Sequence, residues 1–366
     1  MTLEQQKRII ALRQALRSKR LDALLITRPE NRRYLSGFTA HDGQLTESSG
    51  ALLISRDQLI LLTDSRYELQ AGEEATGYKV IVPKHGLPRT LGGLARRYGI
   101  YKLGFESHYL LVSVYERLGR LPALKLISTR GIIEKIRAQK TEEELKNIED
   151  SIRLNEAVFS EINRILRPGM TEREIAFEIE RLTRSMGAED VSFEPIVASG
   201  PNAAKPHATP TDRPIREGES IIIDMGARLN GYCSDMTRTL WLGKTGAKFK
   251  KIYRTVRKAQ VAAIASLKTG LKARDADKIA RDIISKAGYG QAFGHSLGHG
   301  VGLAVHEGPT LSPRSKDTLK AGMVVTVEPG IYIPGWGGVR LENMVVIEDH
   351  GCRVLNNDET FYDFPS

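Results

Sequence analysis

The sequence predicts a two-domain protein of the α/β (α+β) class, in which the second domain is built around a pseudo-twofold axis. Three observations support this fold class. The 366 residues are too many for one ordinary domain, and their 41% hydrophobic share can fill a large core. The first third alternates helical and strand patterns, and the remainder contains a weak internal repeat. We expect the domains to cover residues 1–134 and 135–366.

Hydrophobic periodicity predicts the elements of the first domain. Residues 4–19 place Ile9, Leu12 and Leu16 at helical spacing, and residues 22–27 form a short apolar strand. The elements expected next are strands at 51–55 and 58–63 around a tight turn, a strand at 79–83, a helix at 91–98 and a strand at 102–106. This order describes an α/β unit that ends near Ile132.

Two capping boxes open the second domain. Thr141 with Glu144, and Thr171 with Glu174, each place a capping hydroxyl three residues before a glutamate. Each pair therefore predicts the first turn of a helix.

The second domain also contains a repeat at an offset of 101 residues. The first helix should end near Leu166 and the second at Gly187, and five positions of this region match five later ones: Leu166, Gly169, Glu174, Leu182 and Gly187 match Leu267, Gly270, Asp275, Ile283 and Gly288. Such a repeat predicts helices outside a curved antiparallel sheet that leaves a central cleft.

Charge and composition exclude several classes of function. Lys and Arg number 54 against 44 Asp and Glu, but they are dispersed with acids between them, so we expect no nucleic-acid partner. No apolar run approaches the ~20 residues of a membrane span, and no apolar signal core follows Met1. With only two cysteines the chain cannot build a disulfide framework, which fits a reducing compartment. From these observations together we expect a cytoplasmic protein with no membrane contact.

Two aspartates are predicted to lie side by side on a hairpin. Asn230-Gly231 lies between two β-like runs and favours a type I′ turn. With this turn as the loop, Gly226 falls opposite Asp235, and Asp224 becomes a diagonal neighbour of Asp235. Such carboxylates repel each other unless cations or protons intervene. A solvent-facing acidic pair is the simpler interpretation of the hairpin alone.

Three histidines follow in one glycine-rich segment, residues 294–307. His295, His299 and His306 lie among four glycines, so we expect extended chain with close backbone contacts rather than a helix. One such histidine is usually structural, whereas three in one segment indicate a functional site.

Two further acids interrupt apolar strands. Glu328 ends the run before Pro329, and Glu342 follows Arg340 on the same strand face, where a surface ion pair between them is the alternative interpretation. Two divalent cations would neutralise the four carboxylates, and oxygen and nitrogen ligands without thiolates suit Mn, Co, Fe or Zn. Because paired metals activate water and polarise carbonyls, these residues predict a dinuclear metallohydrolase.

The motifs around these residues resemble those of the pita-bread metallopeptidases, in the aminopeptidase P and prolidase branch that cleaves Xaa-Pro bonds. The matching motifs of the second domain are Asp224-Met-Gly, Asp235 with Thr237, residues 295–302, Val305-His306-Glu307, Val327 to Tyr332 and Arg340-Leu-Glu342. Upstream, residues 31–38, 62–67 and 136–145 resemble the N-terminal domain and interdomain segment shared with creatinase. The resemblance implies a creatinase-like domain followed by a pita-bread domain.

The resemblance also implies residue roles. Five residues would hold two divalent metal ions, with Mn as the first expectation and Asp235 and Glu342 bridging: Asp224, Asp235, His299, Glu328 and Glu342. A bridging water would be the nucleophile, and Glu328 would pass its proton to the proline nitrogen. His207 and His306 would hold the scissile carbonyl, His295 would be a further active-site histidine, and Arg340 would orient the carboxylates.

The activity implied first is Xaa-Pro aminopeptidase, on peptides with proline at the second position, with prolidase (Xaa-Pro dipeptidase) as the alternative. A dipeptidase must hold a free carboxylate near the metals. The extra first domain argues against a methionine aminopeptidase, and the intact ligand set argues against metal-free creatinase and against a non-catalytic histone-binding module. We also expect a homodimer, in which His41 or Arg33 could reach a neighbouring active site.

Overall fold

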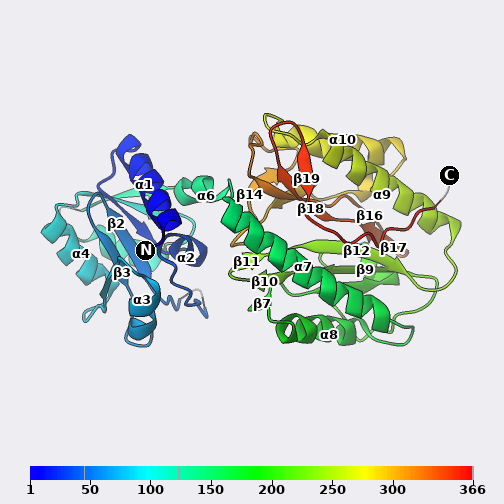
Figure 1. Cartoon of the computed structure of the whole chain (residues 1–366), viewed down its shortest axis with the longest axis horizontal. Coiled ribbons are helices and arrows are strands. Elements are labelled where there is room, and N and C mark those ends of the chain that lie inside the picture. The colour runs from blue at the N-terminus through cyan, green and yellow to red at the C-terminus, as the bar shows by residue number, and fades with distance from the viewer. Residues whose placement is uncertain (45, 123, 365–366) are drawn as a thin grey trace. The chain divides into compact units, whose positions relative to one another are not determined.

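The computed structural model describes residues 1–44, 46–122 and 124–364 (Figure 1). It divides into two compact units, residues 1–137 and 138–366. The division falls three residues after the predicted boundary because α6 (Ile132–Arg137) belongs to the first unit. Ile132 and Ile133 are buried there, and Arg137 Nη1 donates a hydrogen bond to Asn31 Oδ1 at 2.7 Å.

The first unit is a six-stranded mixed sheet with helices around it. The strand order is β4-β3-β2-β1-β5-β6, and only β2 runs antiparallel to its neighbours. The strands are β1 (Ala23–Ile26), β2 (Ala51–Ser55), β3 (Leu59–Leu62), β4 (Lys79–Ile81), β5 (Lys102–Glu106) and β6 (Lys125–Thr129). The helices before α6 are α1 (Leu3–Ser18), α2 (Pro29–Ser36), α3 (Glu68–Glu74), α4 (Leu87–Tyr98) and α5 (Val112–Gly119). The α/β class predicted for this unit is confirmed.

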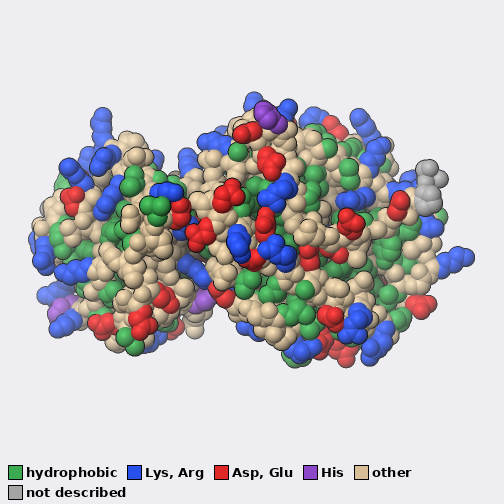
Figure 2. All heavy atoms as spheres, in the orientation of Figure 1, with side chains coloured by type: hydrophobic (Ala, Val, Ile, Leu, Met, Phe, Trp, Pro, Cys, Tyr) green, Lys and Arg blue, Asp and Glu red, His purple; other side chains and the backbone are tan. Residues whose placement is uncertain are grey.

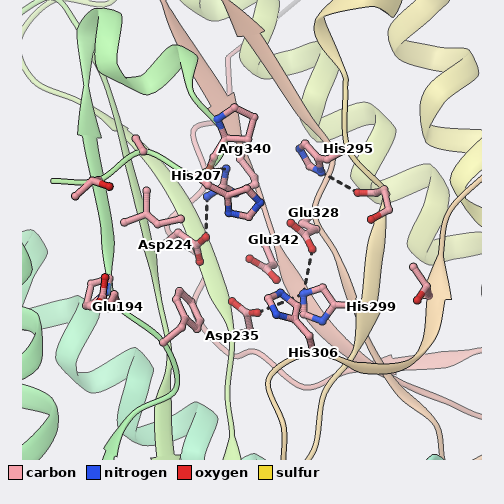
Figure 3. Close-up of a pocket in the computed structure, with 18 of the residues that line it drawn as sticks. Glu194, His207, Asp224, Asp235, His295, His299, His306, Glu328, Arg340 and Glu342 are labelled. Atoms are coloured by element: carbon pink, nitrogen blue, oxygen red, sulfur yellow. Dashed lines mark hydrogen bonds and ion pairs between the residues drawn. The ribbon is translucent and has the colours of Figure 1, made fainter. Parts of the chain in front are cut away.

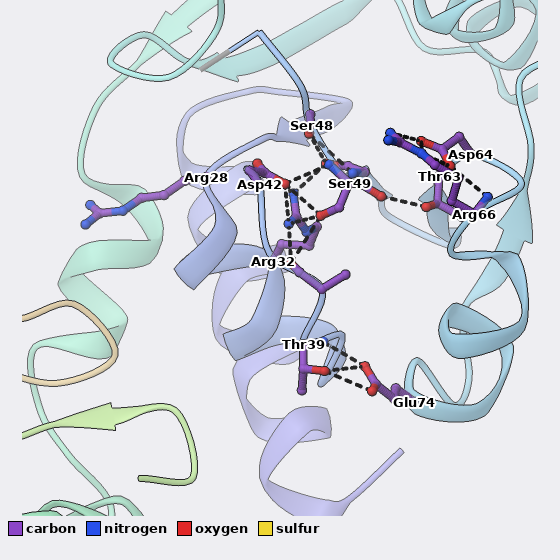
Figure 4. Close-up of polar contacts among 12 residues, drawn as sticks. Arg28, Arg32, Thr39, Asp42, Ser48, Ser49, Thr63, Asp64, Arg66 and Glu74 are labelled. Atoms are coloured by element: carbon purple, nitrogen blue, oxygen red, sulfur yellow. Dashed lines mark hydrogen bonds and ion pairs between the residues drawn. The ribbon is translucent and has the colours of Figure 1, made fainter. Parts of the chain in front are cut away.

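A buried arginine orders the chain that follows α2. Arg32 Nη2 donates to Asp42 Oδ1 at 2.9 Å and to Ser49 Oγ at 2.6 Å, and Arg32 Nη1 donates to the Gly50 carbonyl at 2.7 Å (Figure 4). Because a buried guanidinium needs both a counter-charge and acceptors, this network holds residues 40–42 next to residues 49–50. His41 is exposed on this segment, and its reach toward a neighbouring active site stays a prediction, as does that of Arg33 on α2.

The second unit consists of two similar halves, each a helix pair packed on antiparallel strands (Figure 1). The described strand pairs of this unit are all antiparallel. The first half contains α7 (Glu142–Ile165), α8 (Glu172–Ser185), β7 (Asp190–Val191), β8 (Ile196–Ser199), β9 (Ser220–Met225), β10 (Ala227–Leu229), β11 (Tyr232–Cys233) and β12 (Met236–Trp241), with the short 3₁₀ helix η1 (Gly200–Ala204).

The second half contains α9 (Ala247–Ser266), α10 (Ala273–Lys286), the 3₁₀ helix η2 (Gly290–Ala292), β13 (Gly298–Gly300), β14 (Glu307–Leu311), β15 (Val324–Val327), β16 (Gly330–Ile333), β17 (Gly337–Arg340), β18 (Asn343–Ile347) and β19 (Cys352–Val354). Glycines with positive φ follow the helices at matched positions in both halves. Gly169 and Gly270 have φ of 93° and 88°, and Gly187 and Gly288 have φ of 101° and 88°. The repeat seen in the sequence is therefore a structural repeat. The fold class predicted for this unit is confirmed.

The surface carries both signs of charge. On the face seen in Figure 2, Lys and Arg side chains are interspersed with Asp and Glu rather than gathered in one patch. Among the helices of the described residues, none has the length and apolar character that crossing a bilayer requires.

Candidate metal centre and its cavity

The predicted hairpin brings the two aspartates together. Both residues of the Asn230-Gly231 turn have positive φ, and Thr237 lies opposite Asp224 in the β9–β12 ladder, as the turn requires. Asp235 is therefore the diagonal neighbour of Asp224. Met225 and Met236 face the other way and are buried in the core under α7 and α8. The hairpin thus separates an apolar face from an acidic one.

Glu342 joins the two aspartates in a buried acidic cluster. Carboxylate oxygens of Asp224, Asp235 and Glu342 all lie within 4.8 Å of one another, and the three residues are 9%, 5% and 1% exposed. Asp224 Oδ1 and Glu342 Oε1 have no hydrogen-bond partner within the described part of the chain. Buried carboxylate oxygens without donors are costly, and cations would satisfy them.

His299 and Glu328 complete the cluster from the second half of the unit (Figure 3). His299 Nδ1 lies 3.1 Å from the Gly300 carbonyl, which can only accept, so Nδ1 carries the proton and Nε2 keeps its lone pair. That Nε2 lies 3.3 Å from Glu328 Oε1 and 3.6 Å from Asp235 Oδ2. A cation between this lone pair and the two carboxylates could be bound by all three groups. These oxygen and nitrogen donors therefore suit the metal ions that the sequence predicts.

Burial and mutual repulsion shift the acids of the cluster toward their neutral forms. Burial raises the pKa of Glu328 to about 8, and the nearby Asp224 adds to the shift. Burial and the neighbouring carboxylates also raise the pKa of Asp235 and of Glu342 well above the ordinary range. Burial lowers the pKa of His299 to about 4, and the adjacent His306 contributes. Without metal, the cluster therefore holds protons that cations must displace.

We expect chelator-treated protein to lose stability as pH rises from 6.5 to 8. Over this interval folded Glu328 still holds a proton that its unfolded form, with an ordinary pKa of 4.5, has released. Unfolding then releases a proton, so higher pH favours the unfolded state. The histidines whose pKa is lowered from 6.5, such as His299, oppose this trend only below about pH 6.5.

Thermal unfolding midpoints at pH 6.5 and 8.0, with EDTA or with excess Mn²⁺, test this expectation. Added Mn²⁺ should raise the midpoint more at pH 8.0, because fewer protons compete for the carboxylates. A metal-free midpoint that rises across this interval would contradict it.

Arg340, the last residue of β17, connects residues of the cluster and does not pair with Glu342, which lies between β17 and β18. Arg340 Nη2 donates to Asp224 Oδ2 at 2.7 Å, and Arg340 Nε donates to Thr237 Oγ1 at 3.1 Å. Thr237 Oγ1 in turn donates to Glu342 Oε2 at 2.7 Å. The surface pair between Arg340 and Glu342 that the sequence offered as an alternative is wrong, since both side chains are buried. Arg340 thus orients two carboxylates at once.

His295 lies beside the cluster and contacts Arg340 through a tyrosine. His295 Nδ1 lies 2.8 Å from the Ser296 carbonyl, so this nitrogen carries the proton. Its Nε2 therefore accepts from the Tyr332 hydroxyl at 2.9 Å, and that hydroxyl accepts from Arg340 Nη1 at 2.8 Å. Burial, with Arg340 next, lowers the pKa of His295 to about 4. His295 thus lies in a neutral hydrogen-bonded chain, and Tyr332 is a site residue whose role the sequence did not indicate.

A cavity of about 680 Å³ opens onto the cluster (Figure 3). Its lining includes all nine residues that the sequence selected: His207, Asp224, Asp235, His295, His299, His306, Glu328, Arg340 and Glu342. His207 and His306 are exposed, and the rings of His299 and His306 meet edge to face with centroids 4.2 Å apart. Phe193, Glu194 and Pro195 form part of another wall. Two exposed imidazoles therefore face the space next to the acids.

Close backbone contacts explain the glycines of the histidine segment. A β-carbon on Gly298 would collide with the Thr326 carbonyl, and one on Gly300 would collide with the Gly308 carbonyl. The segment is extended at β13 and contains no α-helix, as predicted. These glycines allow His299 to approach β15, the strand that Glu328 follows.

A buried ion pair beside His306 was not predicted. Lys140 Nζ lies 2.8 Å from Glu307 Oε1, with side chains 1% and 4% exposed. Lys140 is part of the segment at 136–145 that resembles the creatinase group, and Glu307 ends the Val305-His306-Glu307 motif, but neither motif indicated that the two residues pair. The pair neutralises the carboxylate that follows His306 and so keeps an additional charge out of the cavity wall.

Fold and site together define the class: a two-domain protein whose pseudo-twofold unit surrounds a buried centre suited to divalent cations. The model of metallopeptidase family M24 matches residues 146–349, and that of the creatinase/prolidase N-terminal domain matches residues 8–139. The chain therefore belongs to metallopeptidase family M24. It is a peptidase by family, and the predicted pita-bread and creatinase-like domains are both confirmed.

Relatives of known name support this membership. The chain is 37% identical over 343 residues to the Xaa-Pro dipeptidase of Pyrococcus horikoshii, with 93% of both chains covered. The structure of the Xaa-Pro dipeptidase from Bacillus anthracis matches with a TM-score of 0.92 at 39% identity, covering 97% of this chain and 98% of that one. The X-Pro aminopeptidase from Thermotoga maritima matches with a TM-score of 0.84 at 36% identity, covering 93% and 98%.

Proposed function

We propose that this protein is a two-metal peptidase that hydrolyses the bond between an N-terminal residue and proline. The observation that carries the proposal is a cluster of three buried carboxylates, the partly exposed carboxylate of Glu328 and a histidine nitrogen with a lone pair, which all line a cavity together with further histidines. The relatives named for Xaa-Pro peptides support the substrate class.

Five residues would hold the two cations: Asp224, Asp235, His299, Glu328 and Glu342. Mn²⁺ is our first choice, and Co²⁺, Zn²⁺ and Fe²⁺ suit the same oxygen and nitrogen donors. When bound, the ions supply an activated water and polarise the scissile carbonyl. Asp224 Oδ1 and Glu342 Oε1, which lack partners within the described chain, are the atoms that would gain most from the ions.

The side chains around the ions would do the rest of the chemistry. The proline nitrogen is tertiary and leaves only after it is protonated, and Glu328 is the carboxylate we assign to receive a proton and pass it on. His207 and His306, both exposed to the cavity, would donate hydrogen bonds to the carbonyl oxygen as charge develops on it. Arg340 would keep Asp224 in place, and His295 with Tyr332 would support Arg340.

We propose dipeptides as the first substrate, in place of the longer peptides favoured from the sequence alone. The Pyrococcus horikoshii relative and the Bacillus anthracis structure are both named Xaa-Pro dipeptidase, at 37% and 39% identity. The prolidase alternative therefore has better support than the aminopeptidase assignment.

An Xaa-Pro aminopeptidase is the second candidate, and one observation favours it. Arg340 is the only Lys or Arg among the described residues that line the cavity, and its guanidinium is already held by Asp224, Tyr332 and Thr237. The cavity wall of the second unit thus offers no spare cation for the C-terminal carboxylate of a dipeptide. A longer peptide needs no such cation.

We further infer that the protein acts in the cytoplasm and forms a homodimer. Cys233 and Cys352 are not joined in a disulfide, which suits a reducing compartment. Light scattering of the full chain measures the second inference.

Hydrolysis of Ala-Pro and of Ala-Pro-Ala by chelator-stripped protein, before and after addition of Mn²⁺, tests the proposal. We expect no turnover without metal and restored alanine release with it, with Ala-Pro preferred. Preference for Ala-Pro-Ala would select the second candidate. Failure to cleave either peptide with Mn²⁺, Co²⁺, Zn²⁺ or Fe²⁺ would refute the peptidase assignment.

A further inference from the structure

His207 lies on residues 199–211, an irregular segment whose two ends are both held in place. The segment leaves β8 at Ser199, passes through η1, and returns to the start of α8 near Thr211. His207 is exposed in the second half of this segment, between η1 and Thr211. The position of its ring therefore depends on what holds residues 199–211.

One buried carboxylate binds both ends of this segment. Glu172 is 0% exposed, and its Oε1 accepts hydrogen bonds from Ser199 N at 2.6 Å and Ser199 Oγ at 2.9 Å. Its Oε2 accepts from Asn202 Nδ2 at 2.8 Å, Thr211 Oγ1 at 2.7 Å and Thr211 N at 3.1 Å. Five donors from residues 199, 202 and 211 thus converge on one side chain.

A negative charge on Glu172 suits both its position in the helix and its hydrogen-bond donors. Glu172 is the first residue of α8, where the helix dipole favours a negative side chain. Ser199 Oγ also accepts from Arg213 Nη1 at 2.6 Å, which places a cation one hydroxyl away. Hydrogen bonds to a carboxylate are stronger than those to a neutral amide, and an amide has one acceptor oxygen where Glu172 uses two.

A second contact acts close to His207 itself. Arg340 Nη1 donates to the Pro206 carbonyl at 3.0 Å, one residue before His207. Arg340 also holds Asp224, so this contact fixes the segment relative to the acidic cluster. Glu172 fixes the two ends of the segment, and Arg340 fixes the part nearest the cluster.

We propose that Glu172 is a positioning residue for catalysis: it closes residues 199–211 into one rigid segment and thereby aims His207 at the substrate. The catalytic half of this proposal rests on the proposed function, since it requires His207 to contact the scissile carbonyl. The structural half depends only on the five hydrogen bonds.

Glu172→Gln tests the proposal, with Glu174→Gln as the matched control. Glu174 lies in the same first turn of α8, and glutamine preserves its capping box with Thr171. We expect Glu172→Gln to lower kcat roughly 10- to 100-fold with KM changed less than about threefold, the loss typical of a hydrogen bond to a charged group. Bound Mn²⁺ per chain should stay unchanged in both variants, and Glu174→Gln should keep wild-type kcat.

Two further readouts separate positioning from general stability. Hydrogen–deuterium exchange should accelerate over residues 199–211 in Glu172→Gln but not over α9 or α10. In a His207→Ala background, Glu172→Gln should cost little additional kcat, because both changes remove one function. The proposal would be overturned if the two substitutions lowered kcat independently, so that their fold-losses multiplied in the double variant. It would also be overturned if hydrogen–deuterium exchange in Glu172→Gln were unchanged over residues 199–211, or faster throughout the second unit. If the wild type cleaves no Xaa-Pro peptide, the proposed function fails, and the exchange measurement still decides whether Glu172 holds the segment.

Discussion

Glu342→Gln is expected to lower kcat by about a thousandfold or more while leaving the metal-free protein at least as stable as the wild type. The activity would be lost because Glu342 is one of the two acids expected to contact both cations, and its Oε1 is one of the two cluster oxygens without a hydrogen-bond partner among the described residues. Stability is retained because a neutral amide avoids the burial cost and the repulsion from neighbouring carboxylates that raise the pKa of Glu342 well above the ordinary range.

Two measurements on Glu342→Gln check both halves of this expectation. Turnover of Ala-Pro at saturating Mn²⁺ reports the catalytic loss, and the unfolding midpoint in EDTA at pH 8 reports stability. Asn230→Gly, on the exposed turn of the hairpin and away from the cavity, is a control for general effects of substitution in this hairpin, because glycine keeps the positive φ that the turn requires. A Glu342→Gln protein with kcat within tenfold of the wild type would remove Glu342 from the metal centre.

His306→Asn is expected to lower kcat about 100- to 1000-fold, with two Mn²⁺ ions still bound. His306 is exposed to the cavity beside His299, and no metal role is assigned to it. Its imidazole would donate to the carbonyl oxygen only as negative charge develops there, so the loss should appear in kcat rather than in KM.

Glu194→Gln is the matched control for His306→Asn, because Glu194 lines the same cavity and is exposed. It should keep kcat within about threefold of the wild type. Steady-state kinetics on Ala-Pro and calorimetry with Mn²⁺ supply the two readouts. A His306→Asn protein that loses metal in step with activity would move His306 from the carbonyl to the metal centre.

The local elements of the fold were predictable because short-range chemistry determines them. Thr141 and Thr171 form the capping boxes that their sequences predict, and the Asn230-Gly231 turn sets the register that places Asp235 diagonally to Asp224. Short elements without clear periodicity were missed. Examples are α2, which begins at Pro29, and β6, whose burial is only partial.

The site was predictable as a set of residues but not as a network. The nine selected residues line one cavity. Seven of them broke a local rule, as acids beside or within apolar strands or as histidines among glycines, and the resemblance supplied His207 and Arg340. Their metal-binding and catalytic roles stay predictions. Contacts between distant segments left no such signal: Arg340 pairs with Asp224, 116 residues away, rather than with Glu342. Glu172 resembled an ordinary first-turn helix acid, and its partners lie 27 to 39 residues further on.

The central claim is that the buried carboxylates and His299 form a centre for two divalent cations. Isothermal titration of chelator-stripped full-length protein with Mn²⁺ at pH 8 tests it most directly, with Glu342→Gln measured alongside. The account predicts two ions per wild-type chain, proton release on binding, and fewer than two ions for the variant. No Mn²⁺ binding, or binding of equal stoichiometry in wild type and Glu342→Gln, would contradict it.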